Sequence, residues 1–353
     1  MRHTRRRLGI LAIALVICFS SAVQGAPHCK EETLEACLTR EFSGVVIVIR
    51  QGQVVLRAAY GESASGVPNE LADRYRIGSL SKTFTGAAAH DLASQGRLDL
   101  DAPVHDSLPQ FPDMTITSRQ LLEHTAGLGD FSQADWKRLL LDPPSRADVL
   151  AMALAVKRGR PGRFRYSNAG YVILAAVLER VAGEPIESLV QRTILVPLGL
   201  AHTGFATLDA DIAQLSVGHD ARGRPDTTPY HYDGIAAIGG MYSTLDDLLV
   251  WARIQTDPSQ RSATFVSRPS GWATGERFER RAQWHAGLTN SHAAFVLRFR
   301  DEDSLIVALS NRGGEPAKLG PLVKIVAQEF FSDKPPGANQ GPSAAGSIKL
   351  RQQ

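Results

Sequence analysis

The strongest constraint on the fold is a continuous apolar run, Val45 to Ile49, inside a β-rich segment from Phe42 to Arg50. Gln51-Gly52 is typical of a tight turn, and Gln53 to Tyr60 has the composition of a second strand, so the segment predicts a hairpin. A strand with one face in water alternates polar and apolar residues, and this strand does not. We therefore expect a sheet that is covered on both faces.

Strand signals return only near the other end of the chain. Ala294 to Arg300 and Leu305 to Ser310 flank an acidic turn, and a final helix is expected from about Ala317 to Phe331. Between Lys82 and about Tyr232 the pattern is mainly helical. These features predict an α+β fold, in which an antiparallel sheet is flanked by N- and C-terminal helices and carries an inserted helical subdomain. A cleft between two such parts is a common place for a site.

Composition divides the chain into three segments. Residues 1–25 have the form of a secretory signal, with four arginines before the twelve-residue apolar stretch Leu8 to Phe19 and small residues up to a cleavage site after Gly25. Residues 26–332 are expected to form one domain, with an α/β part at about 38–78 and 236–332 and a helical part at about 79–235. Residues 333–353 have the composition of a disordered tail. We therefore expect a periplasmic or secreted protein without stable membrane insertion after signal cleavage.

Net charge does not point to a polyanionic partner. The chain has 39 Lys and Arg and 36 Asp and Glu, and four of the arginines lie in residues 1–25, which contain no acidic residue. Without that segment 35 basic residues remain against 36 acidic ones. This balance gives no electrostatic argument for binding to nucleic acid or to a membrane surface.

Two cysteines remain after the expected cleavage, Cys29 and Cys37. In an oxidising compartment they could form a disulfide bond. Alternatively, both could lie on one short helix as free thiols, because eight helical residues would hold their Cα atoms about 12 Å apart. The sequence leaves both possibilities open.

A candidate nucleophile lies in the stretch Tyr75 to Thr85, which we expect to begin as a short strand or turn that runs into a helix. Apolar residues at helical spacing predict a helix that opens at Ser79 and ends before Gly96. On such a helix Ser79 and Lys82 share a face, and a partly desolvated lysine can be neutral and accept the serine proton. Ser-x-x-Lys is the spacing found in penicillin-recognising enzymes, although the pattern also occurs by chance about once in a chain of this length.

Two further stretches carry side chains suited to the same chemistry. Tyr166-Ser167-Asn168 offers a phenol that can carry a proton and an amide that can hold a carbonyl. His285-Ala286-Gly287 opens the late strands, and a glycine there would let a substrate approach the strand backbone. Taken singly, each stretch is also compatible with an ordinary loop or a core histidine.

Together these stretches resemble the serine β-lactamase and penicillin-binding-protein superfamily, and within it the branch of class C β-lactamases, D-aminopeptidases and esterases. The resemblance covers nearly all of residues 26–332. The similar segments follow one another in order: Arg76 to Thr85, Gly96 to Val104, Leu121 to Leu128 with Ala126 in place of a serine, Tyr166 to Asn168, Pro197 to Thr203, and Gly239 to Thr244.

The resemblance implies a role for each candidate residue. Ser79 would be the nucleophile, and Lys82 and Tyr166 would share the proton transfers. The backbone N–H groups of Ser79 and of Leu288, after Gly287, would form the oxyanion hole. Asn168 would hold the substrate carbonyl or amide, and no cofactor or metal is implied.

The third motif departs from the β-lactamases. His285-Ala286-Gly287 stands where class C β-lactamases have Lys-Thr-Gly, a form seen in the esterase and aminopeptidase-like members. The substitution disfavours efficient β-lactam hydrolysis and leaves the acyl-enzyme chemistry in place. We therefore expect a secreted serine hydrolase acting on an ester, amide or β-lactam bond. The alternatives are a β-lactamase or D-Ala-D-Ala-type peptidase proper, and a penicillin-binding sensor module without turnover.

Other enzyme classes are less compatible with the sequence. His124, His202, His219 and His231 do not form a His-Glu-x-x-His zinc motif, and we expect His124 to brace a loop near the cleft. No Gly-x-Ser-x-Gly elbow is present, which disfavours an α/β-hydrolase. The sequence leaves the oligomeric state open.

Overall fold

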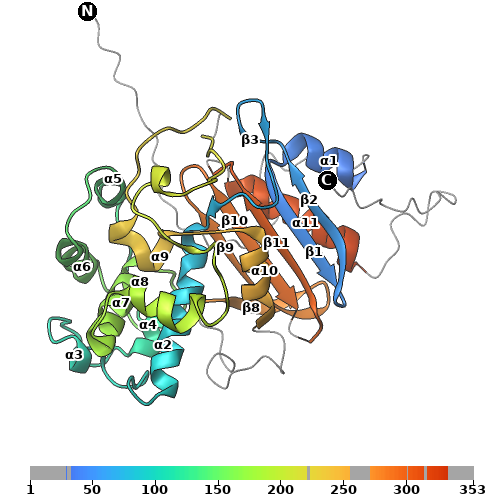
Figure 1. Ribbon diagram of the computed structural model, residues 1–353. Coiled ribbons are helices and arrows are strands. Elements are labelled where there is room, and N and C mark those ends of the chain that lie inside the picture. The colour runs from blue at the N-terminus through green and yellow to red at the C-terminus, as the bar shows by residue number, and fades with distance from the viewer. Residues whose placement is uncertain are drawn as a thin grey trace, which may run out of the picture.

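The computed structural model describes Cys29 and residues 33–220, 223–254, 271–299, 301–313 and 316–332, with side chains in the last range from Leu319 on. The expected signal segment 1–25 and tail 333–353 lie outside the described residues. The largest element is a six-stranded antiparallel sheet in the order β2-β1-β11-β10-β9-β8 (Figure 1). Its strands are β1 (Gly44–Arg50), β2 (Gln53–Tyr60), β8 (Ala273–Arg277), β9 (Arg280–Leu288), β10 (Ala293–Phe299) and β11 (Ser304–Ser310).

Both faces of the sheet are buried, as the apolar run in β1 predicts. Val45, Ile47 and Ile49 belong to the core shared with α2 (Ser81–Ser94) and α10 (Leu245–Ile254). Val46 and Val48 belong to a second core with α1 (Leu34–Glu41) and α11 (Pro316–Phe331). Figure 1 shows α1 and α11 on the side of the sheet that faces away from the helical part. The expected α+β architecture is confirmed.

The helical part lies between the two groups of strands in sequence. It contains α3 (Val104–Ser107), α4 (Ser118–Leu122), α5 (Gln133–Leu141), α6 (Arg146–Leu154), α7 (Asn168–Ala182), α8 (Ile186–Val190), a π-helical turn at Gln191–Leu195 and α9 (Ala236–Gly239). Between the π turn and α9 the chain is mostly irregular, with short 3-10 turns at Asp209–Asp211 and Asp233–Ile235, so the prediction of a mainly helical stretch up to Tyr232 is wrong there.

A short strand or turn was expected at the start of the Tyr75 stretch and is present there as a strand, but the other short strands were not expected from the sequence. β5 (Tyr75–Arg76), β7 (Met241–Ser243) and β6 (Gly204–Phe205) form a small sheet next to the candidate nucleophile, and β3 (Glu62–Ala64) pairs with β4 (Val67–Pro68). The edge strand β8 was also missed, because four of its five residues are exposed and it has no apolar alternation.

The start of helix α2 differs from the one expected. Ser79 lies in a 3-10 turn, Gly78–Leu80, and α2 begins only at Ser81. At the start of α10 the backbone N–H of Asp247 donates to Thr244 Oγ1 at 3.3 Å, so Thr244 caps this helix, while the Ser243 hydroxyl pairs with that of Thr203 at 2.7 Å.

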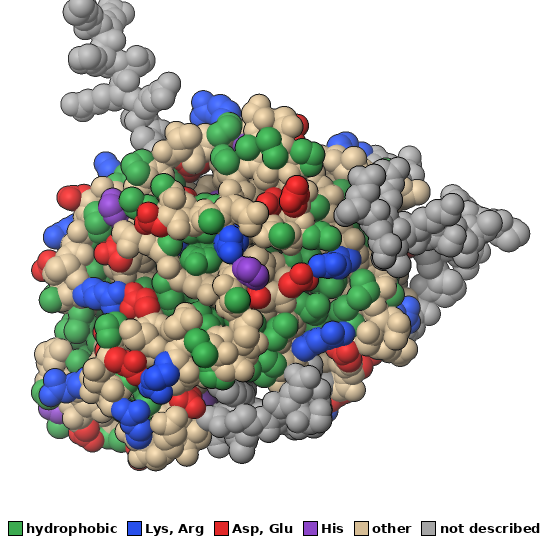
Figure 2. Space-filling model, viewed as in Figure 1, with side chains coloured by type: hydrophobic (Ala, Val, Ile, Leu, Met, Phe, Trp, Pro, Cys, Tyr) green, Lys and Arg blue, Asp and Glu red, His purple; other side chains and the backbone are tan. Residues whose placement is uncertain are grey.

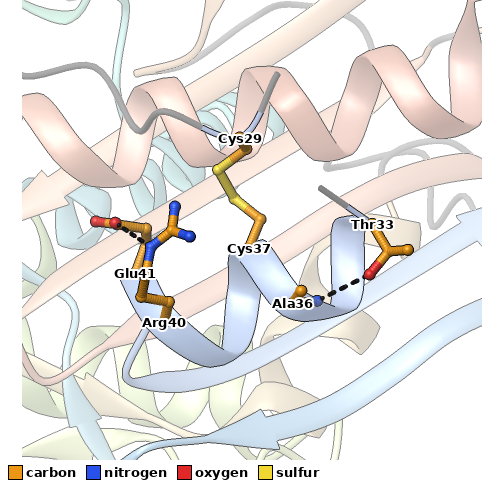
Figure 3. The surroundings of a disulfide bond; sticks show 6 residues. All are labelled: Cys29, Thr33, Ala36, Cys37, Arg40 and Glu41. Atoms are coloured by element: carbon orange, nitrogen blue, oxygen red, sulfur yellow. Dashed lines mark hydrogen bonds and ion pairs between the residues drawn. A yellow bond between two sulfur atoms is a disulfide. The ribbon is translucent and has the colours of Figure 1, made fainter. Parts of the chain in front are cut away.

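Cys29 and Cys37 form a disulfide bond with their Cα atoms 5.5 Å apart (Figure 3). Helix α1 starts at Leu34, where Thr33 caps it by accepting from the Ala36 N–H. Cys29 therefore precedes the helix and reaches Cys37 from outside it, which removes the objection that one helix would hold the two thiols apart. Among the described residues, no helix is both long enough and apolar enough to cross a membrane.

Candidate active site

Ser79 lies in a turn, and the residues on either side of it are buried. Gly78 has a left-handed φ of 49°, which a glycine adopts without strain, and Leu80 and Phe84 are buried in the core beneath the turn. Ser79 itself is partly exposed. Packing of the apolar face of α2 thus fixes the backbone while the hydroxyl stays accessible.

Lys82 lies one turn into the helix and is fully buried. Its Nζ donates to Ser79 Oγ at 3.2 Å and to the Ile238 carbonyl oxygen at 2.7 Å. Burial lowers the pKa of Lys82 to about 7, and the charge of Asp130 opposes this shift. Near neutral pH a substantial fraction of Lys82 is therefore an amine with a free lone pair next to the serine hydroxyl.

Tyr166 is the second proton-carrying side chain that contacts the serine. A hydrogen bond links its side chain to Ser79, and Lys82 Nζ lies 5.2 Å from the centroid of its ring. Burial raises the pKa of Tyr166 above its ordinary value, although the bond to Ser79 acts in the opposite direction. The phenol therefore keeps its proton at neutral pH, and Lys82 is the group that can be deprotonated there.

Asn168 is the first residue of α7, and Asp130 fixes its amide. Asn168 Nδ2 donates to Asp130 Oδ2 at 2.7 Å. A carboxylate can only accept, so the NH₂ group must face Asp130 and the amide oxygen Oδ1 must face away from it. Asn168 therefore presents its amide oxygen as a hydrogen-bond acceptor. From the sequence we expected this side chain to hold the carbonyl or amide of the substrate.

Asp130 was missed by the sequence reasoning. Its Oδ1 accepts from the backbone N–H groups of Phe131, Asn168 and Ala169 at 3.0 to 3.2 Å, so the carboxylate caps the start of α7. Its charge also acts on Lys82 and Tyr166. The only signal in the sequence was its position: Asp130 follows by two residues the segment Leu121 to Leu128, which resembles a segment of the family.

His124 braces the loop that carries the tyrosine, as expected. Its ring stacks on Tyr166 with centroids 4.5 Å apart and on Tyr171 at 4.9 Å. The Ser167 N–H donates to His124 Nδ1 at 3.1 Å, which requires that nitrogen to be unprotonated. Burial, with a smaller contribution from Lys82, lowers the pKa of His124 to about 3, so the ring is neutral.

Strand β9 brings the third motif against the nucleophile turn. A Cβ on Gly287 would lie 1.7 Å from the Ile77 carbonyl oxygen, and a Cβ on Gly78 would lie 2.5 Å from the Leu288 nitrogen. Both glycines are therefore required by a close backbone approach. This approach puts the backbone of Leu288 next to that of Ser79.

His285 lies on the same strand and is 8% exposed. Burial lowers its pKa to about 3, with Lys82 contributing in the same direction, so the imidazole is uncharged across the physiological range. Its Nδ1 has no hydrogen-bond partner in the described part of the chain. The structure thus brings together the three segments that hold the predicted site residues. Ser79 and Lys82 lie where the 3-10 turn meets the start of α2, Tyr166 and Asn168 at the start of α7, and His285, Gly287 and Leu288 on β9.

The four histidines considered for a metal do not meet. Within the described ranges, no three His, Cys, Asp or Glu side chains gather in a way that could hold an ion. His202 instead pairs through Nδ1 with Arg74 Nη2 at 3.0 Å.

Comparison with known proteins assigns the family. The sequence profile of the Beta-lactamase family matches residues 31–328, and the chain belongs to this family. It is therefore a member of a family of serine hydrolases with the fold of β-lactamases and penicillin-binding proteins.

Individual relatives are distant. Protein flp of Staphylococcus aureus (strain COL) is 26% identical over 309 residues, which cover 76% of this chain and 59% of that protein. The chain thus spans about 60% of the length of the curated relatives it matches.

Solved structures share the fold. The octameric penicillin-binding protein homologue from Pyrococcus abyssi has a TM-score of 0.72 at 21% identity, covering 84% of this chain and 78% of that one. The D-stereospecific amidohydrolase from Streptomyces sp. has a TM-score of 0.68 at 24% identity, covering 86% and 97%.

Proposed function

We propose that this protein hydrolyses an ester or amide bond through an acyl-enzyme on Ser79. The observation that carries the proposal is the Lys82 amine, whose pKa burial lowers to about 7 and whose Nζ lies 3.2 Å from Ser79 Oγ. A serine hydroxyl needs a nearby base to become a nucleophile, and a buried lysine of this pKa can act as one at neutral pH.

The proton transfers follow from the order of the pKa values. Neutral Lys82 accepts the Ser79 proton as Oγ attacks the substrate carbonyl. The Tyr166 phenol, hydrogen-bonded to Ser79, relays the proton to the leaving group when the carbon–leaving-group bond breaks. The N–H groups of Ser79 and Leu288 would stabilise the tetrahedral oxyanion, and attack by water, by the reverse sequence, would release the acid.

His285 supports a preference for substrates without a carboxylate next to the scissile bond. A lysine at the third motif would place a fixed positive charge there, and such a contact with a carboxylate contributes about 1.5–3 kcal/mol. A neutral, buried His285 offers a hydrogen bond without that charge. We therefore favour short-chain esters or amides that carry no carboxylate next to the scissile bond over β-lactams.

Two other functions stay open as proposals. Relatives with this fold include a protein described as a β-lactamase/D-alanine carboxypeptidase from Yersinia pestis, which favours a peptidase or β-lactamase. A sensor that acylates without turnover would keep the same residues. Retention of Lys82, Tyr166 and Asn168 around the serine favours a complete catalytic cycle.

The test combines labelling and turnover. A fluorophosphonate probe should label Ser79, intact-mass spectrometry should detect an acyl-enzyme, and p-nitrophenyl acetate or butyrate should be turned over. Ser79→Ala should lose labelling and turnover together. Labelling that survives on another residue would refute the assignment, and labelling without turnover of any ester, amide or β-lactam would favour the sensor.

We also propose that the protein works outside the cytoplasm. The Cys29–Cys37 disulfide supports this location, since such bonds persist in oxidising compartments. The arginine-rich, apolar segment of residues 1–25 is the second support.

A further inference from the structure

A basic loop, residues 157–165, leads from the end of α6 into Tyr166. Its sequence, Lys157-Arg158-Gly159-Arg160-Pro161-Gly162-Arg163-Phe164-Arg165, holds five basic residues and no acidic one. All nine residues are exposed. Because residues 26–353 contain nearly equal numbers of basic and acidic side chains, the basic loop is a local excess of positive charge beside the candidate active site.

The basic loop is held against the segment that carries His124 and Asp130. A Cβ on Gly127 would lie 2.6 Å from the Gly159 carbonyl oxygen, so the two backbones approach closely. Four backbone hydrogen bonds join them: Gly159 N to Gly127 O at 2.8 Å, Gly162 N to Thr125 O at 2.8 Å, Arg165 N to His124 O at 2.7 Å, and Gly129 N to Lys157 O at 2.7 Å. The position of the charges relative to the site is therefore set by the backbone.

Most of the charges in the basic loop have no ion-pair partner among the residues that the structure describes. Arg158 lies over the Phe111 ring at 5.8 Å and donates to the Leu154 carbonyl oxygen. The other four basic side chains form no ion pair or side-chain hydrogen bond with the described part of the chain: Lys157, Arg160, Arg163 and Arg165. On the face shown in Figure 2, basic and acidic side chains lie next to one another.

The end of the basic loop borders the tyrosine side of the site. Phe164 is 62% exposed, and its ring meets the edge of the His124 ring at 5.7 Å, while His124 stacks on Tyr166. A Cβ on Gly129, next to Asp130, would lie 3.8 Å from Arg165 Nη2. In the proposed mechanism this is the side on which Tyr166 passes the proton to the leaving group.

We propose that the leaving group of the substrate carries a carboxylate or phosphate several bonds away from the scissile bond, and that Arg163 and Arg165 bind this anionic group. The arginine guanidinium presents a planar set of donors that matches both anions. Phe164 would pack on the apolar part that links the anion to the reacting carbonyl. The inference rests on the proposed function and adds the substrate class.

An anionic membrane surface fits these observations less well. Binding in a membrane interface needs a broad apolar face beside the basic residues. Phe164 is the only large apolar side chain among residues 157–165. A single aromatic side chain next to the site suits a small organic group better than a lipid bilayer.

The test uses two esters that differ only in a distant charge: 3-(4-acetoxyphenyl)propionate and its uncharged propionamide. Two methylene groups insulate the phenol, so the leaving groups have nearly the same intrinsic reactivity. The wild-type protein should favour the anionic ester by about fivefold in kcat/KM at low ionic strength, and the ratio should fall as salt screens the charges. Arg163→Gln/Arg165→Gln should bring the ratio close to one.

The matched control, Arg180→Gln/Lys324→Gln, removes two exposed charges from α7 and α11 and should leave the ratio unchanged.

If Ser79 forms an acyl-enzyme but the wild-type ratio is one, the inference is wrong and the proposed function stands. Where turnover is absent, the rate of Ser79 acetylation by the two esters, followed by intact mass, gives the same ratio. If neither ester acetylates Ser79, the inference and the proposed function are both wrong. A third outcome is that the wild-type protein binds phosphatidylglycerol vesicles, the arginine variant does not, and the ester ratio is one. The inference would then be wrong, and the basic loop would be a site for an anionic membrane surface.

Discussion

At the scale of single residues, the site is defined by which groups are charged. Burial makes His124 and His285 neutral and brings the Lys82 pKa to about 7, while the charge of Asp130 acts to raise the pKa of Lys82. Lys82, His124 and His285 could be named from the sequence as residues of the site or its surroundings, whereas Asp130 could not. Its role depends on a chain return of 38 residues that places its carboxylate on Asn168, which no local pattern reveals.

His285→Lys should shift specificity toward β-lactams. A lysine supplies the positive charge that a neutral imidazole lacks, and we expect the ratio of kcat/KM for a cephalosporin to that for p-nitrophenyl butyrate to rise about 10-fold, equivalent to 1.4 kcal/mol. The measurement is made at pH 7.5 on both proteins. A wild type that hydrolyses the cephalosporin as well as a good β-lactamase does would contradict the proposal, and so would an unchanged ratio.

Asp130→Asn should impair acylation and change its pH dependence. The carboxylate holds the Asn168 amide and raises the pKa of Lys82, so its loss should lower kcat/KM roughly 10-fold and move the acidic limb of the rate profile to lower pH. Asp135→Asn is the control, because Asp135 caps the start of α5 in a similar way. A lower rate without movement of the limb would mean that Asp130 acts on structure alone.

At the scale of elements, the contact between β9 and the turn at Gly78–Leu80 decides whether the oxyanion donors meet. The residue pattern around His285 indicated a strand here, but no local pattern indicates that Gly287 lies against the Ile77 carbonyl. Nor could it place Ser79 in a 3-10 turn before α2, since 3-10 and α-helical starts have similar residue patterns. Such details arise from packing between segments that are about 200 residues apart.

Gly287→Ala should separate β9 from the turn. The new methyl group would lie 1.7 Å from the Ile77 carbonyl oxygen, so we expect a loss of about 1–3 kcal/mol in the free energy of unfolding and a decrease of at least about 100-fold in Ser79 acylation. Gly170→Ala in α7 is the control, because its Cβ would find its nearest neighbour at 3.5 Å. Denaturant unfolding and probe labelling measure the two effects. Normal labelling of the Gly287 variant would show that Leu288 need not lie beside Ser79.

At the scale of the whole molecule, the sheet takes its strands from the two ends of the chain. That arrangement could be predicted, because an uninterrupted apolar run in β1 requires cover on both faces and the helical patterns lie between the strand signals. The irregular stretch after the π turn could not be predicted in the same way, since its backbone is fixed by hydrogen bonds to distant segments, such as Tyr232 N to Thr207 O and His219 N to Asn311 O.

Export should leave a mature chain that begins near Ala26 with Cys29 and Cys37 joined. N-terminal sequencing of protein recovered from outside the cytoplasm, with thiol counting before and after reduction, measures both. An exported protein that still carries Leu8 to Phe19 would indicate that this segment remains attached as an anchor.

The most direct test of the central claim, that neutral Lys82 is the base for Ser79, is the pH dependence of Ser79 acylation. Acylation by p-nitrophenyl acetate, followed by intact mass, should rise with pH through about 7 and then level off, because the amine form of Lys82 is the active one and the Tyr166 phenol keeps its proton. Lys82→Arg, which keeps the charge but cannot become neutral, should acylate at least about 100-fold more slowly and show no inflection near 7. A wild-type rate that is flat from pH 5.5 to 9, or an arginine variant with the wild-type profile, would contradict the account.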